Sequence, residues 1–130
     1  MSRVLKVSGF VGLAVQMVWG MGNVAGHIVG VPPYWGQLVG AHAHFGVLGI
    51  LAVVTGLAVD QYGTSGTRRT VAVWGFVVGQ WLLPATLVAQ AVLGLPQLGM
   101  LAFVWGICLL VSMVVMAMEA WADSPSGYAA

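Results

Sequence analysis

The sequence has very few charged residues. Of its 130 residues only four are Lys or Arg and three are Asp or Glu, whereas 60% are hydrophobic. The mean hydropathy is +0.98. A soluble domain of this size needs many more charges on its surface, so we expect the chain to be embedded in a lipid bilayer. The net charge of +1, without any basic stripe, also excludes a nucleic-acid-binding surface.

Cysteine is nearly absent as well. The single Cys108 lies in an apolar run, which excludes an internal disulfide bond and a cysteine-based metal cluster.

The loops that follow the first and third apolar runs contain no Lys, Arg, Asp or Glu. The few polar side chains inside the apolar runs are therefore the candidates for function.

The dominant feature of the sequence is its long apolar runs. Four of them, each close to the ~20 residues that cross a hydrocarbon core, predict helices at about 4–25, 37–59, 70–93 and 97–121. Pro32 and Pro33, the polar segment Asp60–Thr70, and Pro96 separate these runs. We expect an all-α, integral membrane four-helix bundle at residues 1–123 and a C-terminal tail at 124–130.

The basic residues predict the orientation of the bundle. All four lie at the start of the first run or between the second and third, at Arg3, Lys6, Arg68 and Arg69. By the positive-inside rule the N-terminus, the middle loop and the C-terminus are cytoplasmic, in a multi-pass protein of a prokaryotic plasma membrane. The second helix then begins at the outer surface.

Small residues at a spacing of four occur in three of the predicted helices. They are Ser8/Gly12, Gly22/Gly26/Gly30, Gly36/Gly40 and Gly75/Gly79. In lipid such residues let helix backbones approach closely, so we expect a tight bundle that self-associates. Gln80 and Gln90, polar groups in an apolar span, are expected to form hydrogen bonds between helices.

The segment GAHAHFGVLG places two of the three histidines, His42 and His44, near the start of the second helix. Positions i and i+2 point about 200° apart on a helix, so the two imidazoles cannot ligate one metal ion and must face two different pockets. Ionisable groups inside a membrane are costly and usually functional. Each ring either forms a hydrogen bond to a neighbouring helix or ligates a metal or haem iron.

The stretch AHAHFGVLGILAVVTGL, Ala41–Leu57, resembles the haem-ligating helix of the haem–copper oxidase and nitric oxide reductase superfamily. In that family the two histidines of this helix reach two haems on its opposite sides, and the helix is the second of a four-helix arc. Three such arcs surround a pseudo-threefold axis. The resemblance implies that His42 and His44 are haem-iron ligands in opposite pockets, and that a chain with one arc assembles as a homotrimer.

The chain departs from the family at two further sites. With only His27 left over, it lacks the three histidines of the copper site, and the arginines that hold haem propionates are missing from the predicted outer loops. Candidates for propionate or pocket contacts are neutral donors near the outer surface, namely His27, Asn23, Tyr34, Trp35 and Gln37.

These features predict a haem b-binding membrane protein for electron transfer or haem carriage. A bis-His haem shared between subunits has no open site for gas reduction, so a membrane cytochrome with an unidentified redox partner is favoured over a complete oxidase or reductase. The alternative is a cofactor-free four-helix membrane subunit or scaffold. A trimeric glutathione-dependent enzyme of the MAPEG group is disfavoured because no cation lies deep in a span, and a copper or zinc carrier because opposed imidazoles chelate poorly.

Overall fold

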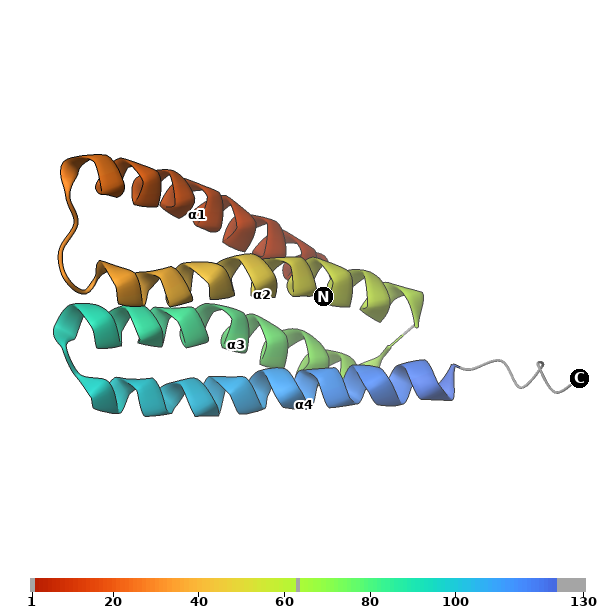
Figure 1. Ribbon diagram of the computed structural model, residues 1–130. Helices are drawn as coiled ribbons and strands as arrows, with labels where there is room; N and C mark the ends of the chain where they lie inside the picture. Colours follow the sequence, from red (N-terminus) through yellow and green to blue (C-terminus); the bar gives the residue numbers. More distant parts are fainter. Residues whose placement is uncertain (1, 63, 124–130) are drawn as a thin grey trace, which may run out of the picture.

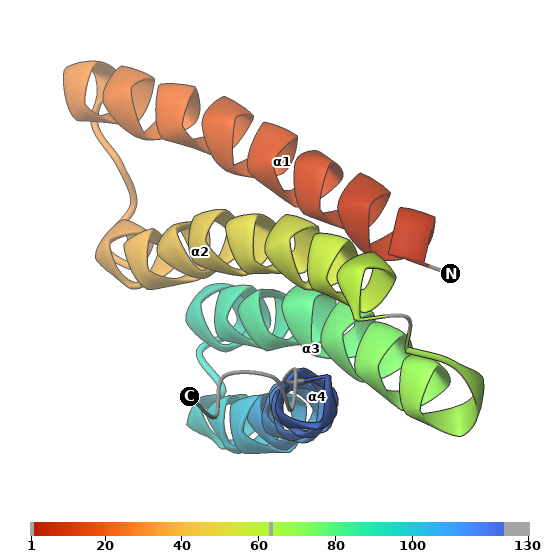
Figure 2. The same cartoon turned by 90° about the vertical axis from the view of Figure 1, so that its right-hand side faces the viewer.

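The computed structural model describes residues 2–62 and 64–123, which form four α-helices. They are α1 (Ser2–Val29), α2 (Trp35–Gln61), α3 (Gly66–Leu93) and α4 (Leu101–Ala122), with a short 3₁₀ helix, η1 (Pro96–Met100), before α4. Neighbouring helices run antiparallel (Figures 1 and 2). The α1–α2 and α3–α4 connections lie at one end, which we call the loop end. The start of α1 and the α2–α3 connection lie at the other, the charged end.

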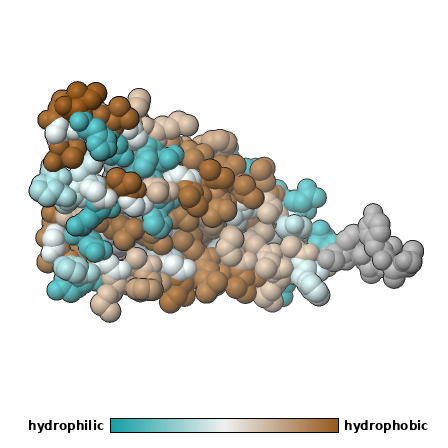
Figure 3. Space-filling view, viewed as in Figure 1, coloured by the Kyte–Doolittle hydropathy of each residue, from teal (hydrophilic) through white to brown (hydrophobic). Residues whose placement is uncertain are grey.

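All four helices are long and apolar enough to cross a membrane, with candidate spans of 27 or 28 residues. Hydrophobic residues cover the middle of the surface in Figure 3, and hydrophilic ones gather toward its two ends. The chain is therefore an all-α, four-helix, multi-pass membrane protein, as the composition predicts.

The helix ends differ from the sequence-based ranges. The first two helices extend two to four residues further at their ends, and α3 begins at Gly66 instead of residue 70. The range 97–121 begins inside η1, because Gly94 ends α3 with a left-handed φ of +63° and Pro96 then starts a tighter 3₁₀ turn. The predicted tail at 124–130 lies outside the described residues.

Most of the buried core lies toward the charged end. Its members come from all four helices: Leu5, Ala52, Val59, Ala72, Val73, Phe76 and Met116. Toward the loop end α1 is poorly covered, and Met17, Met21 and Ile28 are 67%, 66% and 80% exposed. Figure 2 shows α1 diverging from α2 in that direction. Half of α1 therefore presents apolar surface to whatever surrounds the chain.

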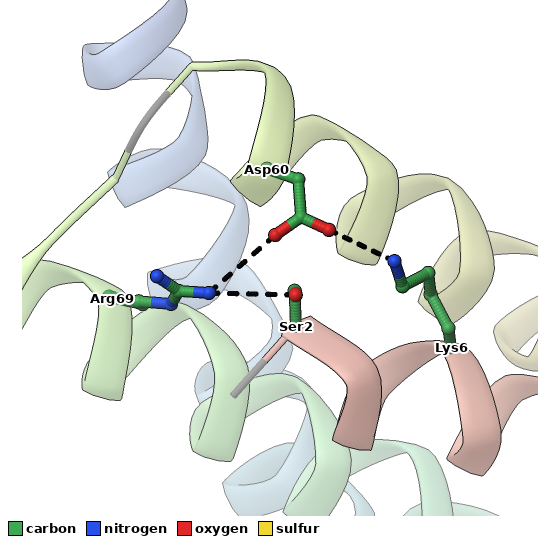
Figure 4. Close-up of polar contacts among 4 residues, drawn as sticks. All are labelled: Ser2, Lys6, Asp60 and Arg69. Carbon is green, nitrogen blue, oxygen red and sulfur yellow. Dashed lines mark hydrogen bonds and ion pairs between the residues drawn. The ribbon is translucent and has the colours of Figure 1, made fainter.

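Ion pairs join the helices at the charged end (Figure 4). Lys6 Nζ lies 2.9 Å from Asp60 Oδ2, and an Arg69 Nη atom lies 3.5 Å from Asp60 Oδ1 and 3.5 Å from Ser2 Oγ. Arg68 pairs with Glu119 at 2.9 Å. Exposed pairs contribute only ~0–1 kcal/mol, so their main effect is to fix which helix ends meet.

Glycine allows two close helix contacts. A Cβ added to Gly9 of α1 would lie 2.6 Å from the carbonyl oxygen of Gly49 of α2, and one added to Gly79 of α3 would lie 2.9 Å from the carbonyl oxygen of Trp105 of α4. The predicted Gly75/Gly79 pair therefore lies at an interface within the bundle. At Gly22, Gly36 and Gly40 the predicted close approach of another helix is not found within the chain, because an added Cβ meets no atom within 4 Å.

A polar group in the middle of the bundle forms hydrogen bonds to α1. The Gln80 side chain, 0% exposed, donates from Nε2 to the Ser8 carbonyl at 3.0 Å and accepts from Ser8 Oγ at 3.0 Å. Trp81 Nε1 donates to Ser8 Oγ at 2.7 Å. The predicted interhelical hydrogen bond is confirmed for Gln80, whereas the Gln90 side chain forms none with a described residue. Ser112 Oγ donates to the Ala72 carbonyl at 2.6 Å and joins α4 to α3.

Candidate functional site

The two histidines of α2 lie near the loop end of the bundle, and the helix places them in different surroundings. The helix starts directly after the Pro32–Pro33 turn, and the histidines lie in its second and third turns. His42 is half-buried and His44 is exposed. Since residues two apart on a helix point in nearly opposite directions, this difference follows from the helix itself.

The His42 ring packs against α1 of its own chain. Its centroid lies 6.0 Å from that of Trp19, with the two planes inclined at 59°. A Cβ on Gly20 would lie 3.4 Å from His42 Cε1, so the glycine leaves space for the imidazole. The Nδ1 atom is buried and has no hydrogen-bond partner among residues 2–62 and 64–123. A buried nitrogen without a partner is costly and marks a place where another group is needed.

The His44 ring lies on the outside of the bundle. Its Nδ1 atom is 2.7 Å from the carbonyl oxygen of Gly40, one turn earlier in α2. That oxygen can only accept, so Nδ1 carries the proton, and in the neutral ring Nε2 then keeps its lone pair. His44, Ala43 and Val47 line a shallow hollow of about 150 Å³. The ring therefore presents a free acceptor nitrogen at the surface of a membrane helix.

Two of the other predicted site residues lie between α1 and α2. Asn23 Oδ1 and Trp35 Nε1 are buried atoms without a hydrogen-bond partner in the described part of the chain. A Cβ on Gly26 would lie 3.7 Å from the Trp35 ring. Asn23 is close to one helical turn from both Gly20 and Gly26. Since α1 faces His42 and Trp35 at those two positions, Asn23 lies on the same side of α1.

The remaining predicted residues are exposed and lie apart from this group. Tyr34 immediately precedes α2, and His27 is in the last turn of α1. Gln37 lines a hollow of about 310 Å³ between α2 and α3, together with Gln90. The structure thus brings His42, Asn23 and Trp35 to one helix interface and leaves His44, His27, Tyr34 and Gln37 outside it.

An aromatic row runs from the site toward α3. The Trp19 and Phe45 centroids are 6.0 Å apart, and those of Phe45 and Trp81 are 5.7 Å apart in an edge-to-face arrangement. Sequence reasoning did not identify Trp19 or Phe45 as neighbours of the site. The spacing of three between His42 and Phe45, which puts both on one helix face, is the signal that could have found Phe45.

This arrangement permits two separate single-histidine ligand sites. Among residues 2–62 and 64–123, no three His, Cys, Asp or Glu side chains come together as a metal site. Each imidazole can supply one nitrogen to an iron, zinc or copper ion, and any further ligand must come from outside the chain.

Comparison with known proteins gives a family without an assigned activity. The family model described as "Domain of unknown function (DUF8059)" matches residues 1–130. No curated protein and no solved structure matches the chain.

Proposed function

We propose that this chain, which belongs to the DUF8059 family, is a membrane cytochrome that binds haem b through His42 and His44. In the proposed assembly three copies form a ring, and each haem receives His42 from one subunit and His44 from its neighbour. The role is electron transfer or haem carriage, with a redox partner in or beside a prokaryotic plasma membrane. The termini face the cytoplasm, since the basic residues gather at that end.

The observation that carries the proposal is the state of the two rings. His44 donates Nδ1–H to the Gly40 carbonyl and keeps a free Nε2 lone pair on an exposed helix face. Metal-ligating histidines have this arrangement, in which a backbone carbonyl fixes the tautomer and orients the ring. An unpartnered nitrogen facing lipid is unfavourable, so a ligand or another subunit should cover it.

His42 supports a second site for a different reason. Its Nδ1 atom is buried without a partner beside Trp19. Two imidazoles with unmet bonding capacity, on opposite sides of one helix, fit two iron sites better than one. A haem iron with two imidazole ligands is six-coordinate and carries single electrons without an open position for a gas.

Haem needs more space than one chain offers at His44. The hollow at His44 holds about 150 Å³, whereas ligand pockets usually hold ~300–1,000 Å³. The walls must therefore be completed by another copy, as the proposed ring requires. For the propionates the chain supplies neutral donors, because no Lys or Arg lies at the loop end: the unpartnered indole N–H of Trp35 and the Nδ2 amide N–H groups of Asn23, whose Oδ1 can only accept.

Visible spectroscopy of the detergent-purified protein tests the proposal. Cells supplied with haem precursor should give a red protein with a Soret band, one haem per chain and a bis-His reduced-minus-oxidised spectrum. His42→Ala and His44→Ala should each abolish or shift that band, because each haem loses one ligand. Val39→Ala, at a side chain of α2 that is 48% exposed, is the matched control and should leave the spectrum unchanged.

Two results would reject the proposal that the protein binds haem. The first is a colourless, folded protein from haem-supplied cells, which would favour the cofactor-free membrane subunit or scaffold. The second is a Soret band that both histidine variants retain unchanged. Light scattering of the same samples measures the mass of the assembly, and a monomer with full haem content would reject the shared site while leaving haem binding in place.

A further inference from the structure

An apolar groove runs along α1 from the charged end toward Trp19. Its first part is a hollow of about 660 Å³ lined by five residues of α1 and one of α3: Arg3, Val4, Val7, Ser8, Val11 and Trp81. Its second part is a hollow of about 460 Å³ lined by Val11, Ala14, Val15, Val18 and Trp19. Val11 belongs to both, so the two hollows adjoin along α1, and together we call them the groove. From residue 3 to residue 19 it extends along about 24 Å of helix.

The polar groups inside the groove are already satisfied. Ser8 Oγ donates to Gln80 and accepts from Trp81 Nε1, so the serine and the indole have no need of a ligand. The other walls are aliphatic or aromatic, and Val4, Val7 and Val11 are 38%, 53% and 46% exposed. Along its length the groove therefore favours an apolar chain without polar atoms.

The charged end of the groove has an unpaired cation. Lys6 and Arg69 pair with Asp60, and Arg68 pairs with Glu119. Within the described ranges, Arg3 is the basic side chain without an acidic partner, and it is exposed at the mouth of the groove. The Arg3 guanidinium group therefore needs an anionic partner, and phosphate oxygens are strong partners for a guanidinium group.

We propose that this groove binds an anionic phospholipid, with its phosphate at Arg3 and one acyl chain along α1 toward Trp19. The length of about 24 Å exceeds half of the ~30 Å hydrocarbon core, so the groove accommodates the acyl chain of one leaflet. The site lies on α1 and α3 and ends at Trp19, whose ring centroid is 6.0 Å from that of His42; its charged end at Arg3 is the part that is separate from the proposed haem site.

Charge favours a lipid over a second copy of the chain in the groove. Copies in one membrane have the same orientation, so a neighbour brings its own charged end to Arg3. That end carries four basic and three acidic residues, a net charge of +1. Asp60 and Glu119 are engaged by their own bases, and among the described residues Asp123 is the acid without a basic partner. A neighbouring copy therefore brings one free carboxylate to Arg3 together with a net positive charge, whereas an anionic headgroup neutralises Arg3 without adding positive charge.

Native mass spectrometry in mild detergent tests the site with two lipids of equal acyl chains, dioleoylphosphatidylglycerol and dioleoylphosphatidylcholine. We expect one tightly bound phosphatidylglycerol per chain and weaker binding of phosphatidylcholine. Arg3→Gln should weaken phosphatidylglycerol binding about fivefold, the effect of one basic side chain near an anionic headgroup, and leave phosphatidylcholine binding unchanged. Arg68→Gln removes the same charge at a paired position outside the groove and should have a much smaller effect.

A second variant tests the groove itself. Val11→Trp fills the junction of the two hollows at an already exposed position and should remove the tightly bound lipid of either kind. Ile107→Trp, on α4 at a side chain that is 59% exposed, is the control and should retain it. Equal affinity for the two lipids, or equal effects of Arg3→Gln and Arg68→Gln, would overturn the proposal. So would a Val11→Trp protein that keeps its lipid, or one that instead loses its oligomeric mass, since the groove would then be a subunit interface.

Discussion

The contact between Gly9 and Gly49 gives the sharpest test of how the bundle is held together. A Cβ on Gly9 would lie 2.6 Å from Gly49 O and 2.9 Å from Val53 N. Ordinary contact begins at 3.4 Å, so Gly9→Ala requires a local separation of about 0.8 Å (3.4 − 2.6) between α1 and α2. These two atoms belong to the backbone, so a rotamer change cannot move them; the third obstructing atom is the side-chain Cγ2 of Val53, at 2.7 Å.

Two effects of opposite sign contribute to this substitution. Overpacking of a well-fitted interface costs ~1–3 kcal/mol. Alanine is also a better helix former than glycine by ~0.8–1.0 kcal/mol, which offsets part of that cost. Gly22→Ala, in the same helix, isolates the second effect, because a Cβ added at Gly22 meets no atom within 4 Å. We therefore expect Gly9→Ala to be less stable than Gly22→Ala by ~1–3 kcal/mol.

The free energy of unfolding is measured by titrating a mild detergent solution of each protein with a denaturing detergent. Helix content from circular dichroism and tryptophan fluorescence follow the transition, and both probes should give one midpoint. If Gly9→Ala proves as stable as Gly22→Ala, the close approach of α1 and α2 at this point does not exist, and the packing derived from it is wrong.

Three further predictions use the same materials. Gln80→Leu should lower the free energy of unfolding by ~1–3 kcal/mol, because the half-buried Ser8 groups lose their Gln80 partner; an unchanged denaturation midpoint would contradict this. Ser112→Ala should cost ~0.5–1.5 kcal/mol through loss of one interhelical hydrogen bond, measured in the same titration. Gly20→Leu should displace the His42 ring, whose Cε1 lies 3.4 Å from an added Cβ, and reduce haem content; full haem content with a normal spectrum would show that this ring is not a ligand.

The helices could be predicted from the sequence because lipid imposes a length on them. Four apolar runs of spanning length, separated by Pro, Gly and polar residues, leave few other solutions, and the structure confirms the four-helix arrangement. The same reasoning misjudged residues 97–100, since hydropathy does not distinguish the 3₁₀ turn after Pro96 from the start of a helix. It also treated Gly36 and Gly40 like Gly75 and Gly79, although only the latter pair lies against another helix of the chain.

Part of the candidate site could be predicted from the sequence for a similar reason. A spacing of two on a helix dictates that His42 and His44 face different surroundings, whatever the rest of the fold. Which of them meets α1 depends on how α2 is rotated about its axis, and that rotation is set by the Gly9–Gly49 contact about two turns away. No local pattern reports it. The roles of His27, Tyr34 and Gln37 stay predictions, because all three are exposed at the loop end.

The different surroundings of the two histidines also bear on the proposed ring. A closed ring of three identical chains uses heterologous interfaces, in which one face of each subunit meets a different face of the next. The chain has two such faces near the loop end: His42 lies at the edge of α1 beside Trp19, and His44 lies on the open side of α2. A two-fold dimer has a single interface in which one patch meets its own copy, so it cannot cover both His42 and His44 on opposite sides of α2. In the proposed ring the two imidazoles therefore belong to different interfaces, and α1 of one subunit would form a wall of the pocket that His44 of the next subunit completes.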